Sequence, residues 1–133
     1  MVLTNFYKMK LGLDIHGIIT EIPDPLSVIT KLLVDNGHEV HILTGETLSE
    51  KLINELEKWG IYYTHLFSII DYQEKRGIEI TYKDNGPWMD GELWDRTKAD
   101  YCTKHQIDLM IDDTKRYGKY FTTPFVFSKI IKK

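Results

Sequence analysis

The stretch LGLDIHGIIT, residues 11–20, decides the fold of this chain. It begins with an apolar segment, reaches an acidic residue at Asp14 and contains a glycine at Gly17. An apolar segment bounded by a polar residue and a glycine is typical of a buried strand that ends in a turn. We therefore predict a strand over residues 10–14 and a turn directly after it.

Capping and breaking residues set the limits of two predicted helices. Asp24 and Pro25 supply an N-cap and a first-turn proline for the first helix, which we expect to end at Gly37. Thr47 and Glu50 form a capping-box pair at the start of the second helix, which we expect to end at residue 60. Both helices follow predicted strands, as the repeating unit of a parallel sheet requires.

The rest of the chain continues this alternation. We predict a helix over residues 95–105 and further strands at 39–43, within 62–70, at 107–111 and at 125–127. The segment 71–94 contains several glycine and proline breakers, and we expect an irregular excursion with at most a small hairpin. The order predicts one α/β domain over residues 1–133, a Rossmann-like three-layer sandwich with a parallel sheet of about five strands and minimal or no cap.

Composition limits the classes of function. The chain has 133 residues, a formal net charge of −3 and a single cysteine, so no internal disulfide is expected. No apolar run is long enough to span a membrane, and the first residues lack the layout of a signal peptide. We expect a cytoplasmic protein that does not bind membranes, and the acidic balance gives no strong case for long nucleic acid as a partner.

Polar and reactive residues stand where the predicted strands end. Asp14 ends the first strand, Thr44 follows the second, and Asp112 and Asp113 follow the strand at 107–111. Lys98 falls in the first turn of the helix predicted before that strand. Taken singly, each is also an ordinary turn, cap or surface residue. Together they predict a site, because ligands of such sheets bind beyond the carboxyl ends of the strands.

The chemistry of this set is specific. Two or three carboxylates that converge at one edge would repel one another unless a hard cation such as Mg²⁺ shared them. An aspartate there can attack phosphorus and form an acyl-phosphate. The hydroxyl of Thr44 and the ammonium of Lys98 have the properties needed to bind the phosphate oxygens.

The segments LGLDIHGII, HILTG and LMIDD, with Lys98 between the last two, resemble the four motifs of the haloacid dehalogenase (HAD) superfamily of aspartate-nucleophile phosphatases. The resemblance covers nearly the whole chain. The adjacent pair Asp112-Asp113 is most similar to the 5'(3')-deoxyribonucleotidase-like group. The resemblance implies a HAD-type fold, Mg²⁺ dependence and hydrolysis of a small phosphomonoester, with nucleotides among the candidates.

The resemblance also implies roles for single residues. Asp14 would be the nucleophile and a metal ligand, and the carbonyl of His16 a second ligand. Thr44, Gly45 and Lys98 would bind the phosphate. Asp112 and Asp113 would bind or orient the metal, with their individual shares unresolved.

His16 departs from the phosphatase pattern, which has an aspartate at this place that protonates the leaving oxygen and then activates water. A histidine can exchange a proton near neutrality, so it can take over this role in catalysis. The alternative is a HAD-like protein of impaired turnover that binds Mg²⁺ and a phosphorylated ligand or partner. A third interpretation, a dehalogenase, is disfavoured because that reaction gives the pair Asp112-Asp113 no purpose.

Residues outside these motifs carry weaker signals. Tyr82, Trp88 and Trp94 are candidates for stacking on a base, although packing of the excursion against the core is the favoured interpretation. We expect the remaining histidines to lie at the surface or the edge of the core, because none has metal-ligand spacing: His38, His41, His65 and His105. The short cap leaves homo-oligomerisation open as a source of specificity.

Overall fold

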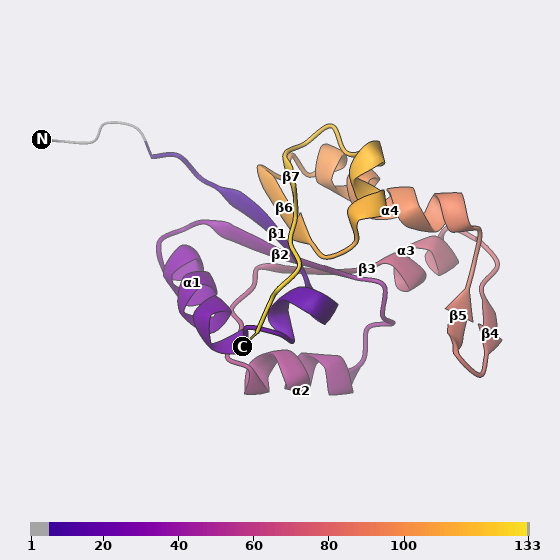
Figure 1. Ribbon diagram of the computed structural model, residues 1–133, viewed down its shortest axis with the longest axis horizontal. Helices are drawn as coiled ribbons and strands as arrows, with labels where there is room; N and C mark the ends of the chain where they lie inside the picture. Colours follow the sequence, from indigo (N-terminus) through magenta and orange to yellow (C-terminus); the bar gives the residue numbers. More distant parts are fainter. Residues whose placement is uncertain (1–5, 133) are drawn as a thin grey trace, which may run out of the picture.

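The computed structural model describes residues 6–132 as an α/β fold (Figure 1). A central parallel sheet carries helices on both faces, and a small hairpin projects beside the start of the last long helix. The elements in chain order are β1 Lys10–Asp14, η1 Ile15–Ile19, α1 Pro23–Asp35, β2 Glu39–Thr44, α2 Glu50–Lys58, β3 His65–Ser68, α3 Ile69–Lys75, β4 Thr81–Lys83, β5 Gly86–Trp88, α4 Gly91–Lys104, β6 Leu109–Asp112, η2 Lys115–Tyr120 and β7 Phe125–Phe127.

The main sheet has the strand order β3-β2-β1-β6-β7, and all neighbours in it are parallel. This confirms the predicted Rossmann-like sheet of five strands. The strands β2 and β3 are added on one side of β1, and after β3 the chain crosses to the other side, where it forms β6 and β7. The strand β1 therefore lies at the centre, with β2 and β6 on either side. The carboxyl ends of these three strands therefore meet at one edge, where a ligand is expected.

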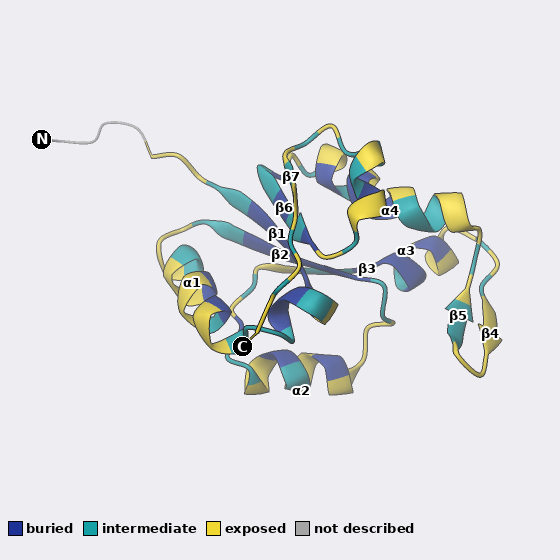
Figure 2. Ribbon diagram, in the orientation of Figure 1, coloured by how far each residue is buried: buried dark blue, intermediate teal, exposed yellow. Residues whose placement is uncertain are grey.

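Alternate side chains of the strands serve the two faces of the sheet. Leu13 and Ile42 are fully buried in the larger cluster, beneath α1, α2 and η1. Leu43 and Met110 point to the other face and pack with Cys102 of α4 in a second cluster. Figure 2 shows the buried residues gathered along the sheet and the inner helix faces. The three predicted layers are present.

Two helix starts differ from the prediction. Asp24 is not the N-cap of α1, because the cap position is Ile22 and Asp24 lies in the first turn. Prolines at 23 and 25 lack an N–H group, which leaves the start of α1 with few donors for a side chain to cap. The helix α2 is capped by Ser49, whose hydroxyl accepts from Leu52 N at 3.1 Å, and the expected capping box at 47–50 does not form.

The excursion 71–94 is more regular than predicted. Its first residues belong to α3, which is anchored by the buried Ile69 and Ile70 and capped by the Ser68 hydroxyl. The predicted small hairpin is present as β4–β5. Helix α4 begins at Gly91, four residues before the predicted start, because the Asp90 carboxylate accepts from Leu93 N at 2.9 Å and caps the helix there. No helix within residues 6–132 is long and apolar enough to cross a membrane.

Candidate active site

A lysine links two aspartates from neighbouring strands at the carboxyl edge of the sheet. Lys98 Nζ lies 2.9 Å from Asp14 Oδ1, at the end of β1, and 2.8 Å from Asp112 Oδ2, at the end of β6. The exposed fractions of Lys98, Asp14 and Asp112 are only 3%, 7% and 0%, respectively. Three predicted site residues from distant parts of the sequence are therefore joined in one buried ionic network.

Lys98 occupies a different position in its helix from the one predicted. Because α4 starts at Gly91, Lys98 lies in the middle of the helix and not in its first turn. Its neighbours Thr97 and Ala99 are also buried. The lysine can reach the sheet edge from the helix interior because its long side chain spans the gap between the two layers.

The electrostatic balance of this network is unusual. Burial, opposed by Lys98 and reinforced by Asp112, raises the pKa of Asp14 to about 7. Burial also acts to lower the pKa of Lys98, but Asp14 and Asp112 outweigh it, and the pKa lies above its ordinary value. Lys98 is therefore protonated at neutral pH, whereas the carboxyl group of Asp14 titrates near pH 7.

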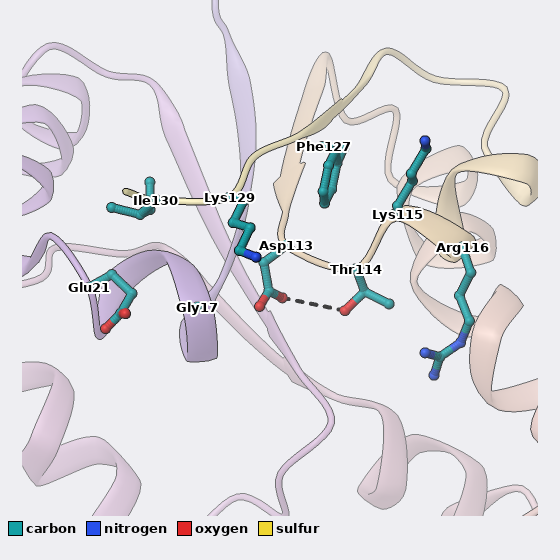
Figure 3. Close-up of a pocket in the computed structure, with 9 residues that line it drawn as sticks. All are labelled: Gly17, Glu21, Asp113, Thr114, Lys115, Arg116, Phe127, Lys129 and Ile130. Carbon is teal, nitrogen blue, oxygen red and sulfur yellow. Dashed lines mark hydrogen bonds between the residues drawn. The ribbon is translucent and has the colours of Figure 1, made fainter. Parts of the chain in front are cut away.

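Asp113 completes a group of three carboxylates. One oxygen from each of Asp14, Asp112 and Asp113 lies within 4.8 Å of the others, a spacing at which one cation can bind all three. Asp14 and Asp112 are buried, whereas Asp113 faces solvent. Figure 3 shows the Asp113 side chain between the turn at Gly17 and Thr114, whose hydroxyl donates to Asp113 at 3.3 Å.

Gly17 allows this approach. Its φ of +88° lies in the left-handed region, and a Cβ atom there would lie 1.9 Å from Asp113 Oδ2. Only glycine satisfies both conditions, because the backbone of η1 kinks at residues 16 and 17. The turn after β1 thus makes room for the third carboxylate.

Replacing Gly17 by Ala should destabilise the protein and displace Asp113. We expect a loss of roughly 1–3 kcal/mol in the free energy of unfolding from backbone strain and the clash together, measured by urea denaturation. Gly77→Ala is the matched control, since Gly77 has a φ of +89° but a Cβ atom there would have no neighbour within 4 Å. Equal losses in the two variants would contradict a specific role of Gly17 in placing Asp113.

Thr44 and Gly45 lie beside this cluster, at the end of β2. The Thr44 side chain is buried, and its hydroxyl oxygen accepts from Glu46 N at 3.1 Å, so its proton is free to be donated to a ligand. A Cβ atom on Gly45 would lie 2.6 Å from the Trp94 ring, so glycine permits close packing of α4 against this loop. Trp94 is fixed in turn by a 2.8 Å hydrogen bond from Nε1 to the Tyr117 hydroxyl.

His16 has a partner that the sequence did not indicate. His16 Nε2 lies 3.0 Å from Glu46 Oε2, and both side chains are substantially exposed. Glu46 comes two residues after Thr44, the last residue of β2. Its position just after a strand was the one feature of the sequence that could have indicated it as a site residue. A carboxylate at this distance orients the imidazole ring and leaves Nδ1 available for another partner.

Most of the predicted site residues line one cavity of about 580 Å³, whose walls include Asp14, His16, Thr44 and Lys98. Its far wall includes Asn85 and Pro87 of the β4–β5 hairpin, together with Trp94 and Tyr117. Sequence reasoning favoured packing for Trp94, which the structure confirms, but missed Asn85 and Tyr117. The interpretation is wrong for Tyr82 and Trp88, whose exposed fractions are 62% and 49%.

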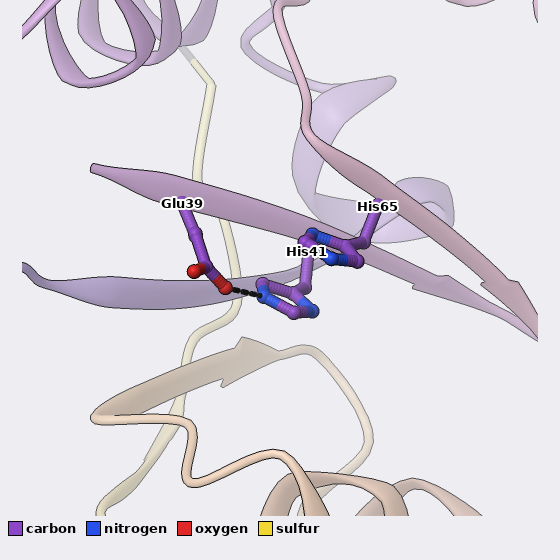
Figure 4. A group of neighbouring side chains, drawn as sticks. All are labelled: Glu39, His41 and His65. Carbon is purple, nitrogen blue, oxygen red and sulfur yellow. Dashed lines mark hydrogen bonds and ion pairs between the residues drawn. The ribbon is translucent and has the colours of Figure 1, made fainter. Parts of the chain in front are cut away.

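A separate polar cluster lies near the amino ends of β2 and β3 (Figure 4). The His41 and His65 rings stack with their centroids 4.0 Å apart, and His41 Nε2 lies 2.8 Å from Glu39 Oε1. The expectation that His41 lies at the surface or core edge is wrong, since only 1% of it is exposed. His41 faces α4, where its Nδ1 lies 2.6 Å from the Tyr101 hydroxyl.

This geometry favours packing over metal binding, although Glu39, His41 and His65 are close enough to share an ion. The two ring planes are inclined by only 2°, so the in-plane lone pairs of the two rings lie in parallel planes and do not meet at one point. Both nitrogens of His41 already have partners. We interpret the cluster as a structural contact.

Acid should destabilise the fold through His41. Burial lowers the pKa of His41 below its ordinary value of 6.5, despite the opposing effect of the hydrogen bond that His41 donates to Glu39, so the unfolded state binds a proton more readily than the folded state. The contribution of neutral His41 to the free energy of unfolding is complete above pH 6.5. It is lost as the pH falls from there through the lower pKa of the folded state. The free energy of unfolding, measured by chemical denaturation, should depend more steeply on pH in this range for the wild type than for His41→Gln. If the two proteins showed the same dependence on pH, His41 would not be the group responsible for the loss of stability in acid.

Comparisons with known proteins add little to this geometry. Neither a protein-family model nor a curated protein matches the chain. Among solved structures, it is similar to a glycosyltransferase from Rickettsia africae ESF-5, with 14% sequence identity and a TM-score of 0.49. The alignment covers 90% of this chain and 29% of that chain, so this chain spans less than a third of the glycosyltransferase.

Proposed function

We propose that the protein is a Mg²⁺-dependent phosphomonoester hydrolase that acts through an aspartyl-phosphate on Asp14. The observation that carries the proposal is the buried network in which Lys98 links Asp14 to Asp112, with the Thr44 hydroxyl in the same cavity. A nucleophile, a cation for phosphate oxygens and a cluster of acidic ligands are the parts that such a reaction requires. The motif resemblance described above agrees with it.

The donor set fits Mg²⁺. Three carboxylates, from Asp14, Asp112 and Asp113, meet one lysine ammonium, which leaves a formal charge of −2 when all are ionised. A divalent cation neutralises this charge, and carboxylate oxygens are the ligands that Mg²⁺ prefers. When bound, it would offset charge on the phosphoryl oxygens and favour ionised Asp14.

The proposed reaction has two steps. An Asp14 oxygen attacks phosphorus, the ester P–O bond breaks, and the leaving oxygen receives a proton. Water then attacks phosphorus, the acyl-phosphate bond breaks, and inorganic phosphate leaves with Asp14 restored. Lys98 and Thr44 line the cavity with Asp14, which suits them to donate to the non-bridging phosphoryl oxygens in both steps.

His16 and Glu46 supply the proton transfers in this proposal. His16 lines the same cavity as Asp14, and the carboxylate of Glu46 at 3.0 Å holds its ring. The imidazole would give its proton to the leaving oxygen and later accept one from the attacking water. A histidine oriented by a carboxylate thus replaces the aspartate of the phosphatase pattern.

The leaving group has room on the side of the hairpin. The active-site cavity shares Asn85, Pro87 and Trp94 with a neighbouring hollow of about 480 Å³ that also contains Trp88. Tryptophan rings, and the Asn85 amide whose oxygen accepts from Trp88 Nε1 at 3.2 Å, suit a planar ring with polar edges. This supports a nucleotide as one candidate substrate.

Hydrolysis of p-nitrophenyl phosphate tests the proposal. We expect turnover with Mg²⁺, loss of turnover in EDTA and full recovery when Mg²⁺ is restored, because the carboxylates need the cation to accept an anionic substrate. Circular dichroism of the EDTA-treated protein controls for unfolding. Equal rates with Mg²⁺ and with EDTA would refute the metal-dependent mechanism.

One observation favours a second candidate, a binding protein of slow turnover. The His16 side chain is 65% exposed, and its Nε2 already lies 3.0 Å from Glu46 Oε2. In this second candidate the ring is held by Glu46 and by solvent and does not protonate the leaving oxygen. The same assay on His16→Asp separates the two functions. A rate increase of about 10²-fold or more would identify the native chain as a binder, whereas a decrease supports catalysis by His16.

A further inference from the structure

A second cavity adjoins the candidate active site on the opposite side of Asp113. It has a volume of about 610 Å³ and shares Asp113 and Thr114 with the active-site cavity. Its remaining walls come from the segment between β1 and α1, from η2, and from the end of β7 with the residues that follow it. The two cavities thus meet at a residue that belongs to the carboxylate cluster.

Basic side chains flank this second cavity. Lys115 and Arg116 come from the start of η2, and Lys129 comes from the segment after β7. In Figure 3, Lys129 lies on one side of Asp113 and Thr114, and the other two lie on the opposite side. The cations therefore reach the cavity from two separate segments, on either side of β7 in the sequence.

The acidic residues beside them are largely engaged elsewhere. Glu21, which lines the cavity, lies 3.8 Å from Lys132 Nζ, and Arg116 Nε lies 3.1 Å from Asp95. Within residues 6–132, neither Lys115 nor Lys129 has an acidic partner at ion-pair distance. If Asp113 binds the cation of the carboxylate cluster, the ammonium groups of Lys115 and Lys129 are available for an anion.

We propose that this cavity binds a second anionic group of the substrate, so that the preferred substrate is a phosphomonoester whose leaving group carries another phosphate. The proposal rests on the proposed function for the reacting phosphate, which lies at Asp14. The part of the leaving group that carries the second phosphate would extend over Asp113 and Thr114, away from the part on the hairpin side, and this phosphate would meet Lys129 and Lys115. A lysine ammonium is a suitable point charge for a phosphate.

Binding of phosphonates tests this without turnover, because their C–P bond is not hydrolysed by this chemistry. Alkane bisphosphonates of graded chain length are compared with the matching alkyl monophosphonates by calorimetry, using the wild-type protein with Mg²⁺. We expect one chain length to bind roughly tenfold more tightly than its monophosphonate, beyond the roughly twofold statistical advantage of two equivalent ends.

Variants locate the second group. Lys129→Ala and Lys115→Ala should each reduce the affinity ratio of bisphosphonate to monophosphonate by roughly three- to fivefold. Lys119→Ala is the matched control, since Lys119 lies on the same η2 turn and is not among the residues of the cavity wall. A ratio near the statistical value at every chain length, or an advantage that neither variant reduces, would overturn the proposal. Hydrolysis of p-nitrophenyl phosphate, assayed separately, reports on the proposed function alone.

Discussion

Asp14→Asn should abolish hydrolysis of p-nitrophenyl phosphate while leaving the fold intact. The asparagine keeps the size of the side chain and can still accept a hydrogen bond from Lys98, whose Nζ lies 2.9 Å from Asp14 Oδ1. It has no anionic oxygen to attack phosphorus, and the carboxylate cluster loses one ligand. We expect a rate decrease of about 10⁴-fold or more, since loss of a nucleophile removes the whole covalent route.

The assay needs a check on folding and a check on specificity. The thermal midpoint of the variant should stay near or above that of the wild type, because the change removes a buried negative charge that burial disfavours. Asp108→Asn is a suitable control, since Asp108 accepts from Lys10 N at the other end of the sheet. Turnover by Asp14→Asn within tenfold of the wild-type rate would mean that another group attacks phosphorus.

Lys98→Met should cause the largest loss of stability among the site variants. The substitution preserves the length and apolar stem of the side chain but removes its charge, leaving Asp14 and Asp112 buried without the cation that now lies within 2.9 Å of both. Breaking a buried ion pair by removing one partner costs about 3–5 kcal/mol. We expect that loss in the free energy of unfolding in EDTA, measured by urea denaturation.

Magnesium should recover part of this loss, because a divalent cation can compensate the two carboxylates once the ammonium is gone. Lys104→Met is the matched control, since Lys104 lies on the same helix and is exposed. If Lys98→Met were no less stable than Lys104→Met, the network would contribute nothing to the fold, and Lys98 would be retained for another reason.

The arrangement of the sheet could be predicted because each strand carries its own signal. The apolar run before Asp14, and the similar runs before Thr44 and Asp112, are short and bounded by polar residues or glycine, and each became a strand. Since parallel strands end at one edge, the polar residues that follow them had to come together. For this reason the sequence could predict that Asp14, Thr44, Asp112 and Asp113 lie close together, without knowledge of the strand order.

Other features depend on contacts that no local pattern encodes. Thr47 failed as a cap because Leu48 N donates to Asp71 Oδ2, a residue from another element, which keeps this segment outside the helix. His41 was placed at the surface or the edge of the core because it has no metal-ligand spacing, yet its ring is buried and its Nδ1 contacts the Tyr101 hydroxyl of α4. Glu46 carries no motif of its own, and its role emerges only from its distance to His16.

The central claim is that Asp14 becomes phosphorylated during turnover, and acid quenching followed by mass spectrometry tests it most directly. The protein is mixed with p-nitrophenyl phosphate and Mg²⁺, quenched within the first turnover and digested at low pH, where acyl-phosphates persist longest. We predict that the peptide containing Asp14 gains the mass of one phosphoryl group, and that Asp14→Asn shows no such gain. Turnover with this peptide unmodified at every quench time, or with the phosphoryl group on a different residue, would contradict the account.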